Sequence, residues 1–279
     1  MRLTAALALA AASLSATAPA AQTLERIAET GVIRLGVRAD ARPLSWMRDG
    51  EPMGFTVDLC LGVMDYIEKM HDISPISAAF VTVTAEDRFD RLEAGEVDLL
   101  CEATSLTLTR RARMDFSIPV YIDGASAMMR ADHETDFMGF AGQRIGVRRG
   151  TSTAEGLQNT LAELSMEAEI EFVDDHAMGL DGVLEGRLAA YFADQSILLG
   201  LMLGSDRRDE LQMYADVMSI EPQAIALPKG DNAFRLTVDT ALSRLFRSGA
   251  VERMFAYNFA PVGMGQAMQA LVTIAPIPE

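Results

Sequence analysis

Residues 79–101 read AFVTVTAEDRFDRLEAGEVDLLC, and this stretch decides the fold class. Its first part, Ala79–Val83, predicts a strand. A helix is expected over Ala85–Ala94, because Gly95 stands directly after it in the position of a helix stop. The short apolar run Val97–Cys101 then predicts a buried strand. Strand, helix and strand in this order indicate a βαβ unit with parallel strands.

The residues before this stretch show the same alternation. Thr23–Thr30 predicts a short helix that Gly31 ends, and Val32–Val37 alternates as a strand. Phe55–His71 predicts a longer helix. Its apolar residues recur three and four positions apart, at Val57, Leu61, Met64 and Ile67. The first hundred residues therefore predict βαβαβ and a parallel or mostly parallel sheet with helices on its faces.

The residues after this stretch predict a second α/β unit. Strands are expected over Ala125–Met129, Arg144–Val147, Ile170–Val173, Leu188–Phe192 and Ala224–Leu227. Helices are expected over Thr153–Ser165, Met178–Glu185, Gln195–Leu203, Asn232–Ser248 and Glu252–Phe259. Two such units favour a small-molecule site between them, since clefts between domains and the carboxyl ends of parallel strands are common binding places.

The N-terminal residues indicate secretion. Residues 1–20 contain one basic residue, Arg2, and a run rich in Ala, Leu and Ser. The end of this run, Ala18-Pro19-Ala20, fits the small-x-small pattern of a signal-peptide cleavage site. A retained membrane anchor is the alternative, but the run is short and rich in Ala for a spanning helix. We expect cleavage and a periplasmic location.

The chain is strongly acidic. It carries 24 Lys and Arg against 40 Asp and Glu, a formal net charge of −16, and loss of Arg2 makes this one unit more negative. Nucleic acid attracts basic surfaces, so we expect no nucleic-acid partner. An anionic membrane surface is disfavoured for the same reason. A small acidic ligand would need a locally positive pocket.

The cysteines and histidines give no sign of a metal site. Cys60 and Cys101 are the only cysteines, and both a disulfide and two buried thiols are open. The histidines are isolated, and the spacings of zinc, nucleotide and hydrolase motifs are missing from the sequence. We therefore expect no catalytic residue, metal ligand or cofactor.

Seven segments together resemble the amino-acid-binding periplasmic proteins of ABC transporters, the solute-binding protein family 3 with the type II periplasmic fold. They are GVIRLGV (31–37), MGFTVDL (53–59), LEAGEVDL (92–99), TLTRR (107–111), MDFSIP (114–119), GVRRGT (146–151) and LPKGD (227–231). Their order and spacing carry the resemblance, which extends from Thr23 to about Phe259. The pattern is nearest to the aspartate/glutamate-binding branch.

This resemblance implies a two-lobed α/β fold, in which each lobe is a mostly parallel sheet flanked by helices and two crossover strands form the hinge. The expected division is a signal peptide at 1–20, lobe 1 at 21–119 and 223–259, lobe 2 at 125–217, hinges at 120–124 and 218–222, and a C-terminal tail at 260–279. It also implies a monomeric substrate-binding component that captures a small amino acid-like solute and delivers it to a membrane permease.

Two other functions on the same fold stay open, because sites rather than folds decide function. One is a periplasmic enzyme similar to cyclohexadienyl dehydratase, which would need a general acid in the cleft such as Glu102 or His176. The other is a ligand-sensing module that reports to a membrane receptor.

The resemblance places Arg110 at the ligand's α-carboxylate and Asp194 at its α-amino group. A guanidinium presents paired donors that match a carboxylate. The alternatives are a surface Arg in a basic run with Arg111, and a helix N-cap at Asp194. Ser105 matches a position whose hydroxyl contacts the ligand.

The turn that contains Thr151 and Ser152 precedes a predicted helix and resembles the loop that meets the ligand carboxylate from lobe 2. Free N–H groups and the helix dipole would favour an anion there, and ordinary helix capping is the alternative.

The remaining expected cleft residues are mostly cationic. In the acidic branch the residues that match Arg38, Arg88 and His176 serve the side-chain carboxylate, and Arg148 would line the same cleft. The alternative for Arg88 is packing in an exposed helix. Because buried charges need partners, the excess of cations favours an acidic or polar side chain over a basic one.

The chain departs from that branch at several positions. Ala85 and Ala103 replace hydroxyl residues, and Ala103 is expected to line the site. Ala41 and Ala85 also occupy places where relatives stack aromatic rings. Glu102 replaces a small residue, and its carboxylate could pair with a cleft arginine or receive a basic ligand group.

Overall fold

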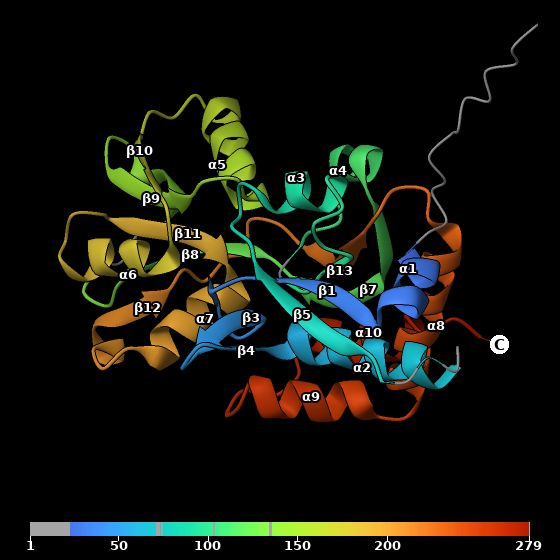
Figure 1. Ribbon diagram of the computed structural model, residues 1–279. Helices are drawn as coiled ribbons and strands as arrows, with labels where there is room; N and C mark the ends of the chain where they lie inside the picture. Colours follow the sequence, from blue (N-terminus) through green and yellow to red (C-terminus); the bar gives the residue numbers. More distant parts are fainter. Residues whose placement is uncertain (1–22, 71–72, 74, 103, 134–135, 279) are drawn as a thin grey trace, which may run out of the picture.

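The computed structural model describes residues 23–70, 73, 75–102, 104–133 and 136–278 (Figure 1). The predicted signal peptide and Ala103 lie outside these residues. Within them the chain forms two five-stranded sheets, each with helices on both faces, and we call the parts built around them lobe 1 and lobe 2. Lobe 2 is on the left in Figure 1.

The sheet of lobe 1 is mixed. Its order is β5 (Ser77–Thr82), β1 (Val32–Val37), β6 (Leu99–Leu100), β13 (Glu221–Leu227) and β7 (Asp115–Asp123). The first three strands are parallel, with Leu35 level with Phe80 and with Leu99, whereas β13 is antiparallel to β6 and β7.

The sheet of lobe 2 repeats this arrangement. Its order is β10 (Glu169–Val173), β9 (Arg144–Arg148), β11 (Ala190–Asp194), β8 (Ala125–Arg130) and β12 (Leu211–Met213). Strands β10, β9 and β11 are parallel, and β8 is antiparallel to both its neighbours. The α/β class is as expected. The sheets are mixed rather than mostly parallel, because the connecting strands β7, β8, β12 and β13 add antiparallel pairings to each.

Both faces of each sheet are buried, which explains the continuous apolar runs of the strands. On β13, Ile225 and Leu227 face one core while Ala224 and Ala226 face another. The larger core lies under α1 (Thr23–Thr30), α2 (Phe55–Met70), α8 (Asn232–Arg247), α9 (Ala250–Asn258) and α10 (Gln266–Ile274). The smaller one lies beneath α3 (Arg88–Glu93).

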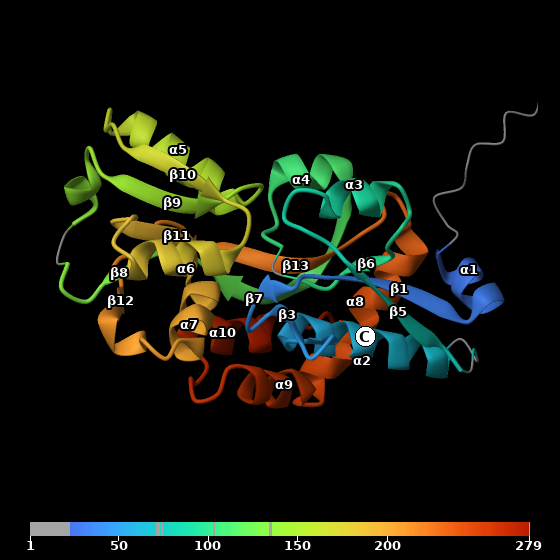
Figure 2. The ribbon, with the colours of Figure 1, turned by 60° about the vertical axis from the view of Figure 1, so that its left-hand side comes forward.

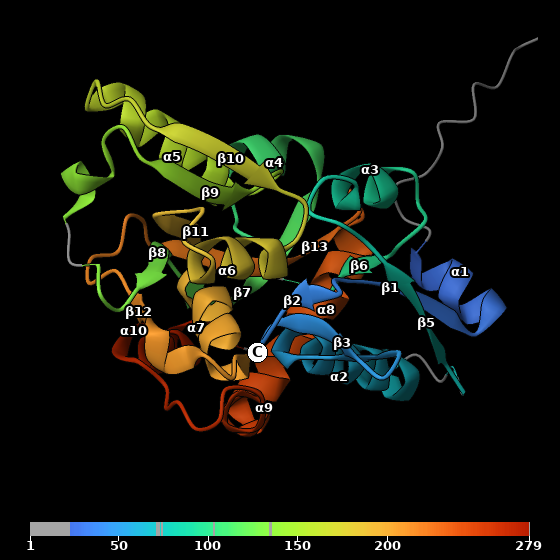
Figure 3. The same cartoon turned by 90° about the vertical axis from the view of Figure 1, so that its left-hand side faces the viewer.

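Lobe 2 is built in the same way. Phe192 on β11 packs with the apolar face of α5 (Ser152–Glu163), while its neighbour Tyr191 packs on the other face with α6 (His176–Leu184) and α7 (Gln195–Gly204). A small sheet of lobe 1, made of β2 (Asp40–Ala41), β3 (Ser45–Arg48) and β4 (Glu51–Met53), adjoins this second core through Ala41. Figure 3 shows β2 next to α6.

The chain crosses between the lobes twice, once from β7 to β8 and once from β12 to β13. In Figure 2, β7 and β13 lie side by side where the lobes meet, and Glu221 is level with Asp123. Gly124 follows β7. A Cβ there would lie 2.2 Å from the carbonyl oxygen of Ser219, so only glycine lets the two crossings approach this closely.

Other features also differ from the sequence-based expectations or settle an open alternative, and the strands β7 and β12 were not among those predicted from the sequence pattern. The segment expected as a tail contains α10, whose Met268 and Leu271 are buried in the core of lobe 1. The β2–β4 sheet was not expected. Cys60 on α2 and Cys101 after β6 form a disulfide, with Cα atoms 6.1 Å apart. A membrane span would need a longer and more apolar helix than any formed by the described residues.

Candidate functional site

A small cavity of about 20 Å³ lies between the lobes and collects most of the predicted site residues. Its lining comprises Arg38, Arg88, Ser105, Arg110, Arg148, Thr151, Ser152, Thr153, His176, Ala193, Asp194 and Ile197. Of the expected residues, Glu102 lies directly behind the lining and Ala103 is outside the described residues. The cavity sits where parallel strands end: Arg38 follows β1, and Arg148 and Asp194 end β9 and β11. Open α/β sheets bind ligands at this edge.

Arg110 lies on α4 (Leu108–Arg113) and is half-buried. Its Nη1 donates to the carbonyl oxygen of Ser105 at 2.9 Å, and its guanidinium lies 5.2 Å from the ring centre of Phe89. No described acid lies within ion-pair distance of it. Its neighbours differ, since Arg111 is exposed and Arg113 pairs with Glu93 on the surface. Arg110 is therefore not simply part of a solvated basic run.

Asp194 occupies the N-cap position of α7 but does not cap it with its side chain. Its carboxylate instead accepts hydrogen bonds from Thr153 Oγ1 at 3.0 Å and from Gln223 Nε2 at 2.8 Å. Gln223 belongs to lobe 1, so this acid already joins the two lobes. Burial, together with the nearby Glu221, raises the pKa of Asp194 to about 6.

A second carboxyl group lies behind Asp194 at the end of β7. Asp123 is buried and accepts hydrogen bonds from Ser196 Oγ at 2.5 Å and from the Ser196 amide at 3.2 Å. Burial and the charge of Asp194 raise the pKa of Asp123 to about 7. These two carboxyl groups at the lobe junction therefore resist being ionised together.

The turn before α5 combines capping with contact across the cleft. Thr151 caps the helix, because its hydroxyl accepts from the Ala154 amide at 3.1 Å. Ser152 Oγ lies 3.0 Å from Ser105 Oγ of lobe 1 and donates to Glu221 Oε2 at 2.8 Å. The capping alternative thus holds for Thr151, while Ser152 faces the other lobe.

Arg38 and Arg88 are buried around Glu102. Nε of Arg88 lies 2.8 Å from Glu102 Oε1, and Nη1 of Arg38 lies 3.5 Å from Oε2. Arg38 also pairs with Asp40 at 2.6 Å. Arg88 is 2 % exposed, so its place is in the cleft wall and not in an exposed helix.

Arg148 is buried with free hydrogen-bonding capacity. Its Nε is 3.4 Å from Asp40 and its Nη2 3.8 Å from Glu86. Within the described part of the chain, Nε and Nη1 donate no hydrogen bond. An unpartnered buried donor is costly, so these atoms point to a ligand acceptor.

His176 offers a further donor. Burial lowers its pKa to about 3, so the ring is neutral. Its Nδ1 lies 2.7 Å from the Tyr191 hydroxyl, whose pKa is raised by burial. Because that hydroxyl stays protonated and can donate to Nδ1, the proton of the ring is assigned to Nε2, which has no partner among the described residues.

Comparison with known proteins identifies this chain. Residues 33–261 match the model of the bacterial extracellular solute-binding proteins, family 3. The chain belongs to this family. Since the family consists of binding proteins, the expectation of a binding protein rather than an enzyme is confirmed.

The relatives of this solute-binding protein carry amino-acid names. It is 28 % identical to the L-glutamate/L-aspartate-binding protein of Pseudomonas aeruginosa, over 89 % of this chain and 84 % of that one. It is 26 % identical to the glutamate/aspartate import solute-binding protein of Escherichia coli, over 85 % and 80 %.

Solved structures confirm the expected two-lobed fold. A periplasmic binding protein from Brucella ovis with glutathione bound has a TM-score of 0.74 and 25 % identity, over 86 % of this chain and 77 % of that one. An ancestral amino acid-binding protein described as a precursor of cyclohexadienyl dehydratase has a TM-score of 0.73 and 22 % identity, over 85 % and 99 %.

Several residues of this solute-binding protein's site were missed from the sequence. They are Asp40, Glu86, Glu221 and Gln223, which contact the predicted residues as described above. Asp40 lies in the unexpected β2–β4 sheet, and Gln223 and Glu221 come from the second crossing. Glu221 and Gln223 are two positions apart on β13 and so share one face of the strand, a pattern from which their place beside the cleft could have been predicted. The sequence around Asp40 carries no such signal.

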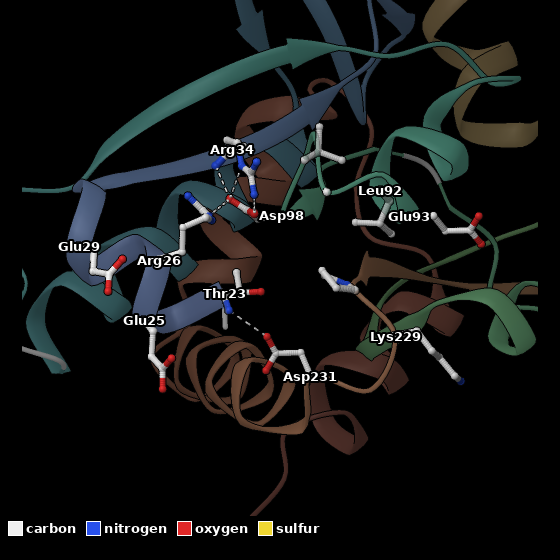
Figure 4. Close-up of a pocket in the computed structure, with 13 residues that line it drawn as sticks. Thr23, Glu25, Arg26, Glu29, Arg34, Leu92, Glu93, Asp98, Lys229 and Asp231 are labelled. Atoms are coloured by element: carbon white, nitrogen blue, oxygen red, sulfur yellow. Dashed lines mark hydrogen bonds and ion pairs between the residues drawn. The ribbon is translucent and has the colours of Figure 1, made fainter. Parts of the chain in front are cut away.

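A larger cavity of about 420 Å³ lies on lobe 1, away from the lobe junction (Figure 4). There Arg26 and Arg34 both bind Asp98, at 2.5 and 2.7 Å, and the Thr23 amide donates to Asp231 at 3.2 Å. Glu25 and Glu29 point away from Asp98 in Figure 4. The cations of this larger cavity are already paired, Arg26 and Arg34 with Asp98 and Lys229 with Asp115, so the smaller interlobe cavity is the better candidate despite its size.

Proposed function

We propose that this protein captures an α-amino acid with an acidic side chain between its lobes in the periplasm, and delivers it as a monomer to the membrane permease of an ABC transporter. Residues 120–124 and 218–222 are the proposed hinge between lobe 1 (21–119 and 223–259) and lobe 2 (125–217), after removal of a signal peptide at 1–20. The names of the relatives support an amino-acid ligand.

One observation carries the choice of an acidic ligand. Two guanidinium groups line the cavity with capacity for an anion: Arg110 forms no ion pair with a described acid, and Nη1 of Arg148 donates no hydrogen bond within the described chain. Each can receive one carboxylate. Asp194 lies between the lobes at hydrogen-bonding distance of neutral partners and can accept an ammonium group. Two carboxylates and one ammonium group describe an acidic α-amino acid.

The charges around the cavity lead to the same ligand. When Arg110 takes the α-carboxylate and Asp194 the ammonium group, the cations that remain are Arg38, Arg88 and Arg148. The acids beside them are Asp40, Glu102 and the exposed Glu86, which lies 3.8 Å from Arg148. These three arginines share Glu102 and Asp40, and a side-chain carboxylate of the ligand would give Arg148 a close partner of its own.

Binding requires the lobes to part. A cavity of about 20 Å³ holds little more than a water molecule, so an amino acid cannot enter as the side chains stand. The lobes are held together by direct contacts such as Ser152 with Glu221 and Gln223 with Asp194. A ligand with groups for both lobes would replace these contacts and favour a closed state.

The other candidate functions receive less support. A dehydratase would need a general acid in the cleft. Glu102 is engaged in a buried ion pair with Arg88, and burial keeps His176 neutral. A sensing role would use the same site and is separated from transport by the partner alone.

Calorimetry on two arginine variants tests the proposal. Arg110→Ala should weaken glutamate and glutamine alike by about tenfold to a hundredfold, the value of one charged hydrogen bond. Arg148→Ala should weaken glutamate by a similar factor and leave glutamine nearly unchanged. Arg111→Ala, an exposed neighbour, is the control. Unchanged affinity in Arg110→Ala would show that the ligand lies elsewhere.

A further inference from the structure

We propose that Glu102 determines ligand specificity as a built-in carboxylate: it occupies the space between Arg38 and Arg88, withholds both guanidinium groups from the ligand's side chain, and leaves anion recognition to Arg148. This inference rests on the proposed function and deepens it, because it names the residue that limits how many negative charges the cleft accepts.

Glu102 is part of the protein's interior rather than of its solvated surface. It is 1 % exposed, and Arg38 and Arg88 are 3 % and 2 % exposed. Its Oε1 accepts a hydrogen bond from Thr104 Oγ1 at 2.8 Å and lies at the same distance from Arg88 Nε. Its Oε2 faces Arg38 at 3.5 Å. Both oxygens are therefore held in place by groups of lobe 1.

The two arginines beside Glu102 are engaged by the protein. Besides its ion pair with Glu102, Arg88 donates to the carbonyl oxygens of Ala85 and Gly150. Arg38 donates from Nε and Nη2 to Asp40 at 3.0 and 2.6 Å. Nε of Arg88 and Nε of Arg148 each lie near an acid, at 2.8 Å from Glu102 and 3.4 Å from Asp40, but Nη1 of Arg148 donates no hydrogen bond within the described chain. Arg38 and Arg88 are therefore bound by groups of the protein itself, whereas Arg148 can still donate a hydrogen bond to the ligand's side chain.

The engaged arginines nevertheless line the cavity, so a change at Glu102 would reach the ligand. Burial lowers the pKa of Arg88 to about 10, with Arg110 and Arg38 adding to the shift and Glu102 opposing it. Without the carboxylate, a positive charge would remain in a place that excludes water. Such a charge should attract any anion that can enter.

A purely structural role for Glu102 would give different results from a specificity role. A structural acid, when neutralised, lowers the stability of the protein and weakens all ligands in parallel. A built-in carboxylate, when neutralised, changes the ratio between a charged ligand and its neutral isostere. Glutamate and glutamine form this pair, since they differ in charge and hardly in size.

The decisive experiment is calorimetry with glutamate and glutamine on the wild type and on Glu102→Gln. The amide keeps the size of the side chain and removes its charge. The preference for glutamate over glutamine should increase by about tenfold or more, as expected for one additional charged interaction. A ratio that stays the same, with both affinities lowered together, would overturn the inference.

A second experiment uses acetate as the probe and does not depend on the amino acid. Glu102→Ala leaves a space between Arg38 and Arg88 that a free carboxylate can fill. Millimolar acetate should raise the melting temperature of this variant, at constant ionic strength set with chloride, and should leave the wild type unchanged. The matched control is Glu93→Ala, which removes an exposed acid paired with Arg113 at 2.7 Å. No response in Glu102→Ala would count against the inference.

The outcomes separate this inference from the proposed function. If the wild type binds glutamate and Glu102→Gln keeps the same preference, only the role of Glu102 is wrong. If the wild type binds arginine and not glutamate, and Glu102→Gln loses it, Glu102 receives a ligand cation and both proposals are wrong.

Discussion

At the residue scale, the site depends on which charged groups have partners. Glu102 and Asp40 engage Arg38 and Arg88, whereas among the described residues Arg110 forms no ion pair and Nη1 of Arg148 donates no hydrogen bond. A sequence shows how many arginines there are but not which of them are already paired. We expect a second carboxylate on the ligand because Arg148 has open hydrogen-bonding capacity, and not because the cleft contains many arginines.

The carboxyl pair at the lobe junction predicts a pH dependence of stability. The pKa values of Asp123 and Asp194, about 7 and about 6, lie above the ordinary value of 3.8. A carboxyl group with a raised pKa stabilises the fold while it is protonated, and this contribution is lost as the pH rises through 4 to 7.

The variant Asp123→Asn isolates this effect from the other titrating groups. The melting temperature of this variant, relative to that of the wild type, should rise as the pH increases from 4 to 8. The reason is that its amide stays neutral, whereas the wild-type carboxyl group must ionise. A difference that is constant over this range would contradict the shared titration.

Ligand binding should follow the opposite course, since an ammonium group prefers ionised Asp194, and should weaken below about pH 6.

At the scale of elements, most helices and strands could be predicted because their apolar periodicity is strong. Thr23–Thr30 and Val32–Val37 are found within the predicted bounds, and the helix expected from Phe55 ends at Met70. The β2–β4 sheet could not be predicted, because its strands of two to four residues are too short to show a period. Asp40, which links Arg38 to Arg148, was missed with it.

The site was predictable where a residue follows a strand or carries a family motif. Arg110 and Asp194 were expected for that reason and now line one cavity. Gln223 and Glu221 were missed because their role depends on how the second crossing lies against lobe 2. The disulfide was left open because spacing alone cannot give the 6.1 Å between Cα atoms.

The turn at Gly150 makes a prediction about closure. Gly150 has φ +74°, and a Cβ there would lie 2.9 Å from the carbonyl oxygen of Ala85 in the opposite lobe. Gly150→Ala should therefore hinder closure and weaken the ligand. Gly142→Ala is a matched control, because φ is +70° and its Cβ would meet nothing within 4 Å. Equal affinity in the two variants would show that the turn is not a closing contact.

The disulfide between α2 and the end of β6 makes a prediction about stability. It joins residues 41 positions apart. Closing a loop of this size in the unfolded chain is worth about 4 kcal/mol in the chain-entropy model. The double variant Cys60→Ala/Cys101→Ala should lose a comparable free energy of unfolding in urea and keep its ligand preference. An unchanged unfolding midpoint would contradict a bond in the folded protein.

At the scale of the whole molecule, function follows from two similar lobes that meet at the carboxyl ends of their parallel strands. Arg110, Arg38 and Arg88 come from lobe 1, and Arg148, His176 and Asp194 from lobe 2. Neither lobe holds a complete set of partners for an amino acid. The ligand is therefore expected to stabilise the closed arrangement of both lobes by binding them together.

We propose that the cleft between the lobes selects an acidic α-amino acid. Calorimetry of the wild-type protein with glutamate, aspartate, glutamine, arginine and leucine tests it most directly. Glutamate or aspartate should bind most tightly, glutamine more weakly, and arginine and leucine least. Tight binding of arginine without binding of glutamate or aspartate would contradict the assignment of Arg148 and Arg110 to two ligand carboxylates.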